Sequence, residues 1–172
     1  MQTVFGDPDE RGRLMSMVGS VTPDMFASDA GAFLDFLANR SEVKGEAFGV
    51  CGYCMGGRAS LVVAGWHPDR IAAAGSIHGG HLATDQPGSP HLLADRIRAT
   101  VLVAGAENDA TFPVEQADLL EKTLTAAGVD HKIEFYPAAH GFAVPDAPSY
   151  DAKAAERHWI SLRELFGAAL AG

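Results

Sequence analysis

Three side chains that could together hydrolyse an acyl bond are spread along this chain of 172 residues. Cys54 lies within the sequence Gly-Tyr-Cys-Met-Gly-Gly, between a short apolar run and a helical pattern. Asp109 and His140 each follow a later apolar run. A thiolate can attack a carbonyl carbon, an imidazole can take and return the proton, and a carboxylate can hold the imidazole in one tautomer. We therefore expect these three side chains to meet in one site.

The cysteine occupies a tight turn between a predicted strand and a predicted helix, where a nucleophile is held in a strained conformation. Gly52 and Gly56, two residues before and two residues after it, are expected to relieve clashes in this turn. The amino end of the helix favours thiolate over thiol, and the Met55 amide can face a developing oxyanion. The turn alone is a weak indication, because the chain contains 19 glycines and the pattern arises easily by chance.

The order of the three groups strengthens the prediction. Asp109 and His140 follow the third and fourth predicted strands, and the carboxyl ends of parallel strands meet at one edge of an open α/β sheet. Glu107 is a rival for the acid, because it is closer to its strand. Asp109 is preferred, since residues 111–113 lead directly into the next helix.

Four further side chains are candidates for contact with the substrate: Tyr53, His78, His81 and Phe142. The two histidines follow the end of the second predicted strand, and the two aromatic residues lie close in sequence to the cysteine and to the later histidine. A His-Gly-Gly-His sequence without a third and fourth ligand nearby does not predict zinc. We therefore expect neither a metal nor a cofactor.

The elements that must position these residues alternate between strands and helices, which predicts an α/β fold with a parallel sheet. Apolar runs predict strands over residues 47–51, 71–77, 100–105 and 132–136. Apolar periodicity and capping residues predict helices over residues 22–39, 54–66, 113–127 and 150–166. Ser149 is expected to cap the last helix.

Residues 1–21 are expected to form an irregular segment, in which only a short helix around residues 11–18 is foreseen. Residues 22–172 are expected to form the domain. Helical spacing assigns five aromatic side chains to core packing: Phe33, Phe36, Trp66, Trp159 and Phe166.

Composition limits the partners of the chain. Hydrophobic residues make up 47% and charged residues 20%, which is typical of a folded domain with a core. The net charge of −9 disfavours nucleic acid and anionic membranes in the absence of a basic patch. The longest apolar stretches, of about ten residues, are too short to span a bilayer. The acidic start of the chain and its two closely spaced cysteines predict a cytoplasmic protein without a signal peptide.

Three blocks of the sequence together resemble the catalytic blocks of the dienelactone hydrolases, also called carboxymethylenebutenolidases. These blocks are Gly-Tyr-Cys54-Met-Gly-Gly, Glu107-Asn-Asp109-Ala-Thr-Phe-Pro113 and Tyr136-Pro-Ala-Ala-His140-Gly-Phe142. The resemblance extends from about Thr22 to the carboxyl terminus. It implies an α/β-hydrolase that opens small lactones or esters, with Cys54, Asp109 and His140 as its catalytic triad.

The sequence departs from that family in two places. The family carries earlier strands of the sheet before this point, and its loop after the third strand supplies a second oxyanion amide and a Glu that interacts with the resting thiol. We therefore expect a partial sheet with a bare edge along Ala47–Cys51, through which the chain alone self-associates. The lactone hydrolases also place an Arg four residues after the catalytic histidine. This chain has Val144 there, so a broader ester or thioester substrate fits equally well.

Two other functions remain open. Cys51 and Cys54 form a C-x-x-C pair at a strand–helix junction, which is also typical of thioredoxin-like redox proteins. Alternatively, the chain is an inactive remnant that keeps the motif but lacks a complete oxyanion hole.

Overall fold

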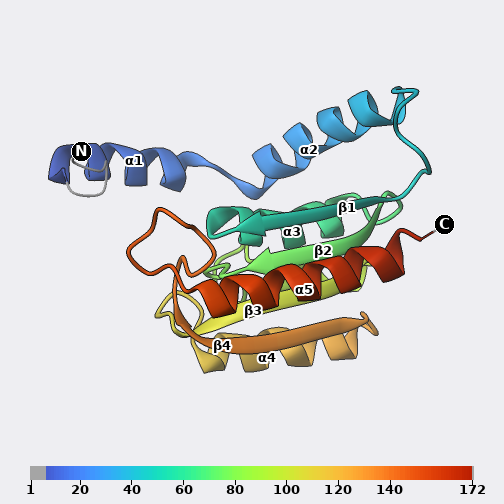
Figure 1. Ribbon diagram of the computed structural model, residues 1–172. Helices are drawn as coiled ribbons and strands as arrows, with labels where there is room; N and C mark the ends of the chain where they lie inside the picture. The colour runs from blue at the N-terminus through green and yellow to red at the C-terminus, as the bar shows by residue number, and fades with distance from the viewer. Residues whose placement is uncertain (1–6, 172) are drawn as a thin grey trace.

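Parallel strands covered on both faces need apolar side chains at nearly every position, and four runs of this sequence form such a sheet. The computed structural model describes residues 7–171 (Figure 1). The strands are β1 (Phe48–Tyr53), β2 (Ile71–Ile77), β3 (Thr100–Asn108) and β4 (His131–Ala139). They are all parallel and lie in the sheet in the order in which they occur along the chain. The predicted α/β class, with a partial parallel sheet, is confirmed.

Helices cover both faces of this sheet, as Figure 1 shows. One face carries α2 (Pro23–Ala38), α3 (Met55–Trp66), the short 3-10 helix η2 (Pro90–Arg96) and α4 (Val114–Ala126). Among the described residues, the opposite face carries α5 (Ala152–Ala169) and no other helix. None of the helices within residues 7–171 is both long enough and apolar enough to cross a membrane.

The start of the chain corrects one expectation. Residues within 1–21 were predicted to be irregular, but α1 spans Pro8–Ser20 and exceeds the short helix expected around 11–18. Its cap is Asp7, whose carboxylate accepts the backbone N–H groups of Asp9 (3.0 Å) and Glu10 (3.3 Å). The Asp7-Pro8 sequence is thus a helix start. No residue of α1 is buried.

Strand β4 is longer than predicted, because Pro137 does not end it. A proline lacks the N–H that a sheet interior requires, but β4 lies at the edge of the sheet. The register against β3 also shifts between Ala106 and Asn108, opposite this proline. The edge position and the irregularity together accommodate the missing donor.

The last helix begins later than predicted. Asp151, rather than Ser149, caps α5, and its carboxylate accepts the N–H of Ala154 at 2.8 Å. The hydroxyl of Ser149 donates instead to the backbone carbonyl of His140 at 2.7 Å. Ser149 therefore fixes the loop that carries His140.

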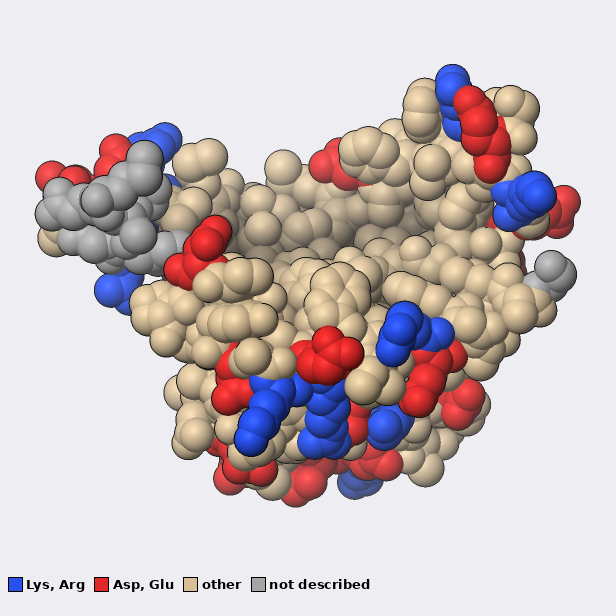
Figure 2. Space-filling view, viewed as in Figure 1, with Lys and Arg blue, Asp and Glu red and all other residues tan. Residues whose placement is uncertain are grey.

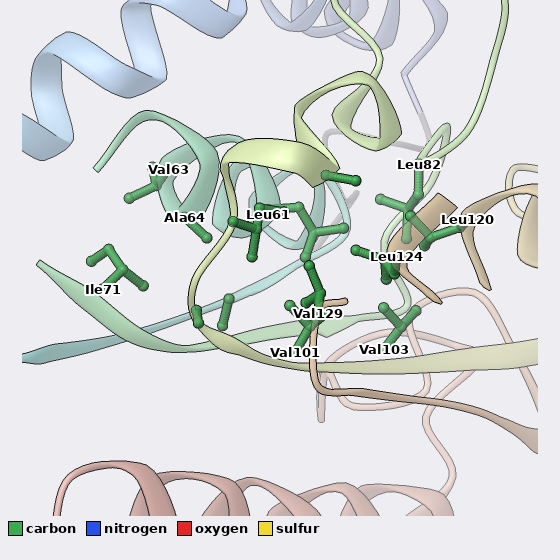
Figure 3. Close-up of a cluster of buried hydrophobic side chains, with 14 of the residues drawn as sticks. Leu61, Val63, Ala64, Ile71, Leu82, Val101, Val103, Leu120, Leu124 and Val129 are labelled. Atoms are coloured by element: carbon green, nitrogen blue, oxygen red, sulfur yellow. The ribbon is translucent and has the colours of Figure 1, made fainter. Parts of the chain in front are cut away.

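Two apolar clusters lie on the two faces of the sheet. The larger cluster joins α3 and α4 to β2 and β3, and Figure 3 shows many of its side chains. The smaller cluster joins α5 to the other face of β2, β3 and β4. Four of the five aromatic side chains assigned to the core lie outside both clusters. The exposed fractions are 69% for Phe33, 59% for Phe36, 40% for Trp66 and 52% for Trp159.

Only Phe166 among these five packs against a cluster, and it is partly buried. The prediction for the other four is wrong because helical spacing identifies an apolar side of a helix without showing that another element covers it.

The first strand differs from the others in having a free edge. Within residues 7–171, β1 pairs with β2 alone. Gly49 and Cys51 are exposed, so β1 is not covered on both faces. A groove separates β1 from α2, and its lining includes Phe33, Leu34, Leu37, Phe48 and Val50. Figure 2 shows a largely uncharged hollow on this side of the molecule.

The burial of two leucines of α4 predicts that their substitution by alanine has different effects on stability. Leu124 is fully buried and Leu119 is 39% exposed. We expect Leu124→Ala to lower the free energy of unfolding by about 2–5 kcal/mol through lost burial and a cavity, and Leu119→Ala to lower it by less than about 1 kcal/mol. Urea denaturation followed by circular dichroism measures both. Equal losses would contradict this description of the core.

Candidate active site

The carboxyl ends of three strands bring Cys54, Asp109 and His140 together. Cys54 follows β1, Asp109 follows β3 and His140 follows β4. His140 Nδ1 lies 2.6 Å from Asp109 Oδ2, and the His140 side chain is also close enough to the Cys54 thiol to lower the pKa of that thiol. Three groups that are distant in the sequence thus interact in one line.

The cysteine has the strained backbone expected of a nucleophile in a tight turn. Its φ is 54° and its ψ is −118°, a combination that side chains other than glycine rarely adopt. A Cβ at Gly52 would overlap the backbone carbonyl of Gly56, so no larger residue fits there. The corresponding expectation for Gly56 is wrong, because a Cβ at that position would meet nothing within 4 Å.

The second glycine that the turn requires is Gly57. A Cβ there would lie 2.8 Å from Ser76 Oγ and 2.9 Å from Gly79 Cα. The amino end of α3 therefore packs directly against the loop that follows β2.

The acid is held by its own loop. The Asp109 side chain is almost completely buried, and its Oδ1 accepts both the N–H (2.9 Å) and the hydroxyl (2.7 Å) of Thr111. Burial by itself would raise the pKa of this carboxyl, but the hydrogen bonds from Thr111 and His140 lower it. Glu107 belongs to the end of β3 and is exposed. The geometry therefore favours Asp109 over Glu107 as the partner of His140.

Charge is stabilised on both Cys54 and His140. The hydrogen bond with His140 lowers the pKa of the Cys54 thiol against the opposing effect of burial, and the Met55 N–H also donates to the sulfur. The same hydrogen bond raises the pKa of His140 to about 9, with burial opposing and Asp109 adding to the shift. Both shifts favour the thiolate–imidazolium pair over the neutral pair, which is the direction expected of a reactive cysteine.

The four side chains expected to contact substrate divide into two groups. Tyr53 is half-buried, with its hydroxyl 3.1 Å from His158 Nε2, and His81 is exposed at the same end of the sheet. His78 and Phe142 are 1% and 0% exposed. Neither side chain therefore offers exposed surface to a substrate. The His78 ring packs edge-on against His140, and Phe142 packs against His78.

Sequence reasoning missed two contributors to the site. Thr111 holds Asp109, and a signal was present because a hydroxyl residue two positions after an aspartate commonly closes a turn. Trp159 is exposed, and its ring centroid lies 6.5 Å from that of Tyr53. Nothing in the helical pattern of α5 distinguished it from a core residue.

The two cysteines are both free thiols and both exposed. Partial burial raises the pKa of the Cys51 thiol, whereas the pKa of the Cys54 thiol is lowered. Among residues 7–171, no cluster of three or more His, Cys, Asp or Glu side chains is arranged to hold a metal ion.

Comparison with known proteins identifies relatives along almost the whole chain. The model of the dienelactone hydrolase family matches residues 2–170. A Synechocystis protein whose name includes carboxymethylenebutenolidase is 32% identical over 143 residues, which cover 81% of this chain and 57% of that protein. The carboxymethylenebutenolidase of Rhodococcus opacus is 32% identical over 128 residues, covering 70% of this chain and 50% of the enzyme. The chain thus spans about half the length of these relatives.

Solved structures share the fold. A crystal structure from Klebsiella pneumoniae, whose name includes dienelactone hydrolase, superimposes with a TM-score of 0.79 at 25% identity. The match covers 87% of this chain and 63% of that structure. The sheet and its flanking helices are therefore those of an α/β-hydrolase of this type.

The packing of the turn predicts opposite outcomes for alanine substitutions at Gly52 and at Gly56. Gly52→Ala places a methyl group on the Gly56 carbonyl, so we expect it to disrupt the turn and to abolish the fast reaction of Cys54 with iodoacetamide. Gly56→Ala fills open space in a helix, so we expect wild-type labelling and an unfolding free energy raised by about 0.5–1 kcal/mol. Mass spectrometry of labelled protein and urea denaturation measure these effects. Wild-type labelling of the Gly52→Ala variant would disprove the proposed packing.

Proposed function

This chain belongs to the dienelactone hydrolase family, and we propose that it hydrolyses a small ester or lactone with Cys54 as nucleophile. The observation that carries the proposal is that His140 is held by Asp109 at 2.6 Å and interacts on its other side with the thiol of Cys54. Its three members lie at the strand ends where α/β sheets bind ligands. In this interpretation they are a catalytic triad.

The first half of the reaction forms a thioester. The Cys54 thiolate attacks the acyl carbonyl carbon, and the carbonyl oxygen becomes an oxyanion that accepts the Met55 N–H. The bond to the leaving oxygen then breaks, and His140 gives its proton to that oxygen. Asp109 keeps the His140 proton on Nδ1 directed away from the substrate, so that Nε2 performs the transfer.

The second half releases the acid. The neutral His140 takes a proton from water, and the resulting hydroxide attacks the thioester carbonyl. The carbon–sulfur bond breaks, and the electron pair returns to Cys54. The carboxylic acid leaves, and the thiolate–imidazolium pair is restored.

The substrate class follows from what surrounds the nucleophile. Tyr53 and Trp159 offer aromatic surface beside it, and the exposed Val144 stands where the lactone hydrolases of this family carry an arginine. An uncharged acyl group therefore suits this site at least as well as a substrate that bears a carboxylate.

A dithiol function would require Cys51 as the partner of Cys54. The hydrogen bond of Cys54 to His140, and the raised pKa of Cys51, favour hydrolysis instead. A remnant without a complete oxyanion hole would keep the same geometry but hydrolyse its substrate slowly, since the loss of one oxyanion donor costs about 10²–10³ in rate.

Substitutions at the two cysteines and at the histidine test the proposal. We expect Cys54→Ala and His140→Ala to lower kcat for p-nitrophenyl acetate by about a thousandfold or more, because each removes a member of the triad. Cys51→Ser should stay within about twofold of the wild type, since no step uses that thiol.

The rate of Cys54 alkylation at several pH values supplies a second measurement. The lowered pKa of Cys54 predicts fast labelling at pH 7 that declines as the pH falls through that pKa, and His140→Ala should remove the advantage. Loss of activity in Cys51→Ser would favour dithiol chemistry. Labelling of the wild type no faster than that of free cysteine would favour the remnant.

We also propose that the chain alone pairs with a second copy of itself along the free edge of β1. This edge carries unpaired backbone groups and no charged side chain over Phe48–Tyr53, and such edges readily pair with another strand. The exposed Phe33 and Phe36 of α2 extend the apolar surface beside it.

A charge on this surface should weaken the association. We expect Phe33→Glu to shift the chain toward the monomer, because the pairing would bury the new carboxylate. Met17→Glu, at a comparably exposed position of α1, should leave the association unchanged. Size-exclusion chromatography with light scattering, over a range of concentrations, measures the mass. A wild-type chain that stays monomeric at high concentration would rule the pairing out.

A further inference from the structure

His78 lies directly behind the nucleophile. It is 1% exposed, and its Nδ1 accepts the backbone N–H of Cys54 at 3.2 Å. The same N–H also donates to the carbonyl of Ile77 at 3.1 Å. The strained residue of the turn is thus held by two acceptors, one of which is a side chain.

The loop that follows His78 touches the other parts of the site. A Cβ at Gly80 would lie 2.5 Å from Thr111 Oγ1, and the N–H of His81 donates to the carbonyl of Thr111 at 2.8 Å. Gly79 packs against Gly57 in the turn of the nucleophile. One short loop therefore joins the turn of Cys54 to the turn that holds Asp109.

The ring of His78 also supports His140. The two ring centroids lie 5.1 Å apart in an edge-on arrangement, and Phe142 packs on His78 at 5.2 Å. The left-handed backbone of His78, with φ at 38°, places the ring between these groups. His78 is thus in contact with the turn of the nucleophile on one side and with the base on the other.

The acceptor role requires an unprotonated Nδ1. Burial, together with the positive charge of His140, lowers the pKa of His78 to about 4, against the opposing effects of the backbone carbonyl of His78 and of Asp109. The charge of His158 makes a smaller contribution in the lowering direction. The neutral ring then carries its proton on Nε2, for which the described residues provide no hydrogen-bond partner.

We propose that His78 is a positioning residue for the hydrolysis, on which this inference rests. Its neutral imidazole holds the Cys54 amide and the ring of His140 in the arrangement in which the thiolate–imidazolium pair forms. It does not touch the substrate. The functional requirement is an acceptor at the position of Nδ1, and not merely a side chain of this size.

Two substitutions separate these requirements. His78→Phe keeps a ring but removes the acceptor, and His78→Asn offers Oδ1 near the position of Nδ1. We expect His78→Phe to slow iodoacetamide labelling of Cys54 at pH 7 by roughly three- to tenfold, the effect of one hydrogen bond, and to move its pH midpoint upward. His78→Asn should retain most of the rate and the midpoint. His131→Phe, at the opposite end of the sheet, is the matched control and should label as the wild type does.

Equal loss in the Phe and Asn variants would mean that His78 only fills space, and an unchanged midpoint in His78→Phe would overturn the proposal. The wild-type protein gives an independent measurement if a variant fails to fold. Nitrogen-15 NMR of the histidine rings should show His78 neutral from pH 5.5 to 8 with its proton on Nε2. A proton on Nδ1, or titration within that range, would overturn the proposal. Ester hydrolysis by the wild type is measured separately, so its absence would refute the hydrolase proposal without deciding the state of His78.

Discussion

The strained backbone of Cys54 is the constraint on which the rest of the site depends. A residue held at this φ and ψ costs on the order of 1–3 kcal/mol, so the surrounding structure must stabilise it. The stabilisation comes from close backbone packing of Gly52 on Gly56 and of Gly57 on Gly79, and from the two acceptors of the Cys54 N–H. Close packing beneath the turn thus holds the sulfur atom of Cys54 in an exposed position.

Electrostatic interactions influence the charge states of the groups that this packing brings together. The thiolate and the imidazolium stabilise each other, and the buried Asp109 stays ionised because Thr111 and His140 saturate its oxygens. The neighbouring His78 is kept neutral, so that no second positive charge competes with His140. The pKa shifts of these four neighbouring groups thus favour charge on three of them and disfavour it on the fourth, a pattern that is common in active sites.

The sequence predicted the order of strands and helices, and the three residues that meet at the strand ends, because apolar runs, caps and motif order are local signals. It failed where the answer depended on neighbours. Trp159 and Phe33 have core-like spacing but face solvent, and Phe142 and His78 were expected to contact the substrate but are buried. Residues 1–21 were expected to be irregular, although Asp7 followed by Pro8 is a strong helix start. Burial and register are properties of the assembled sheet, and no single segment encodes them.

The strand order β1-β2-β3-β4 has a consequence for biosynthesis. Each new strand pairs with the one made just before it, so the sheet can grow by addition at one side as the polypeptide leaves the ribosome. Asp109 and His140 arrive only with the last two strands. A nascent polypeptide that contains Cys54 but not yet His140 therefore lacks the main group that lowers the pKa of this thiol, so the reactive form of the cysteine can arise only after β4 has been made.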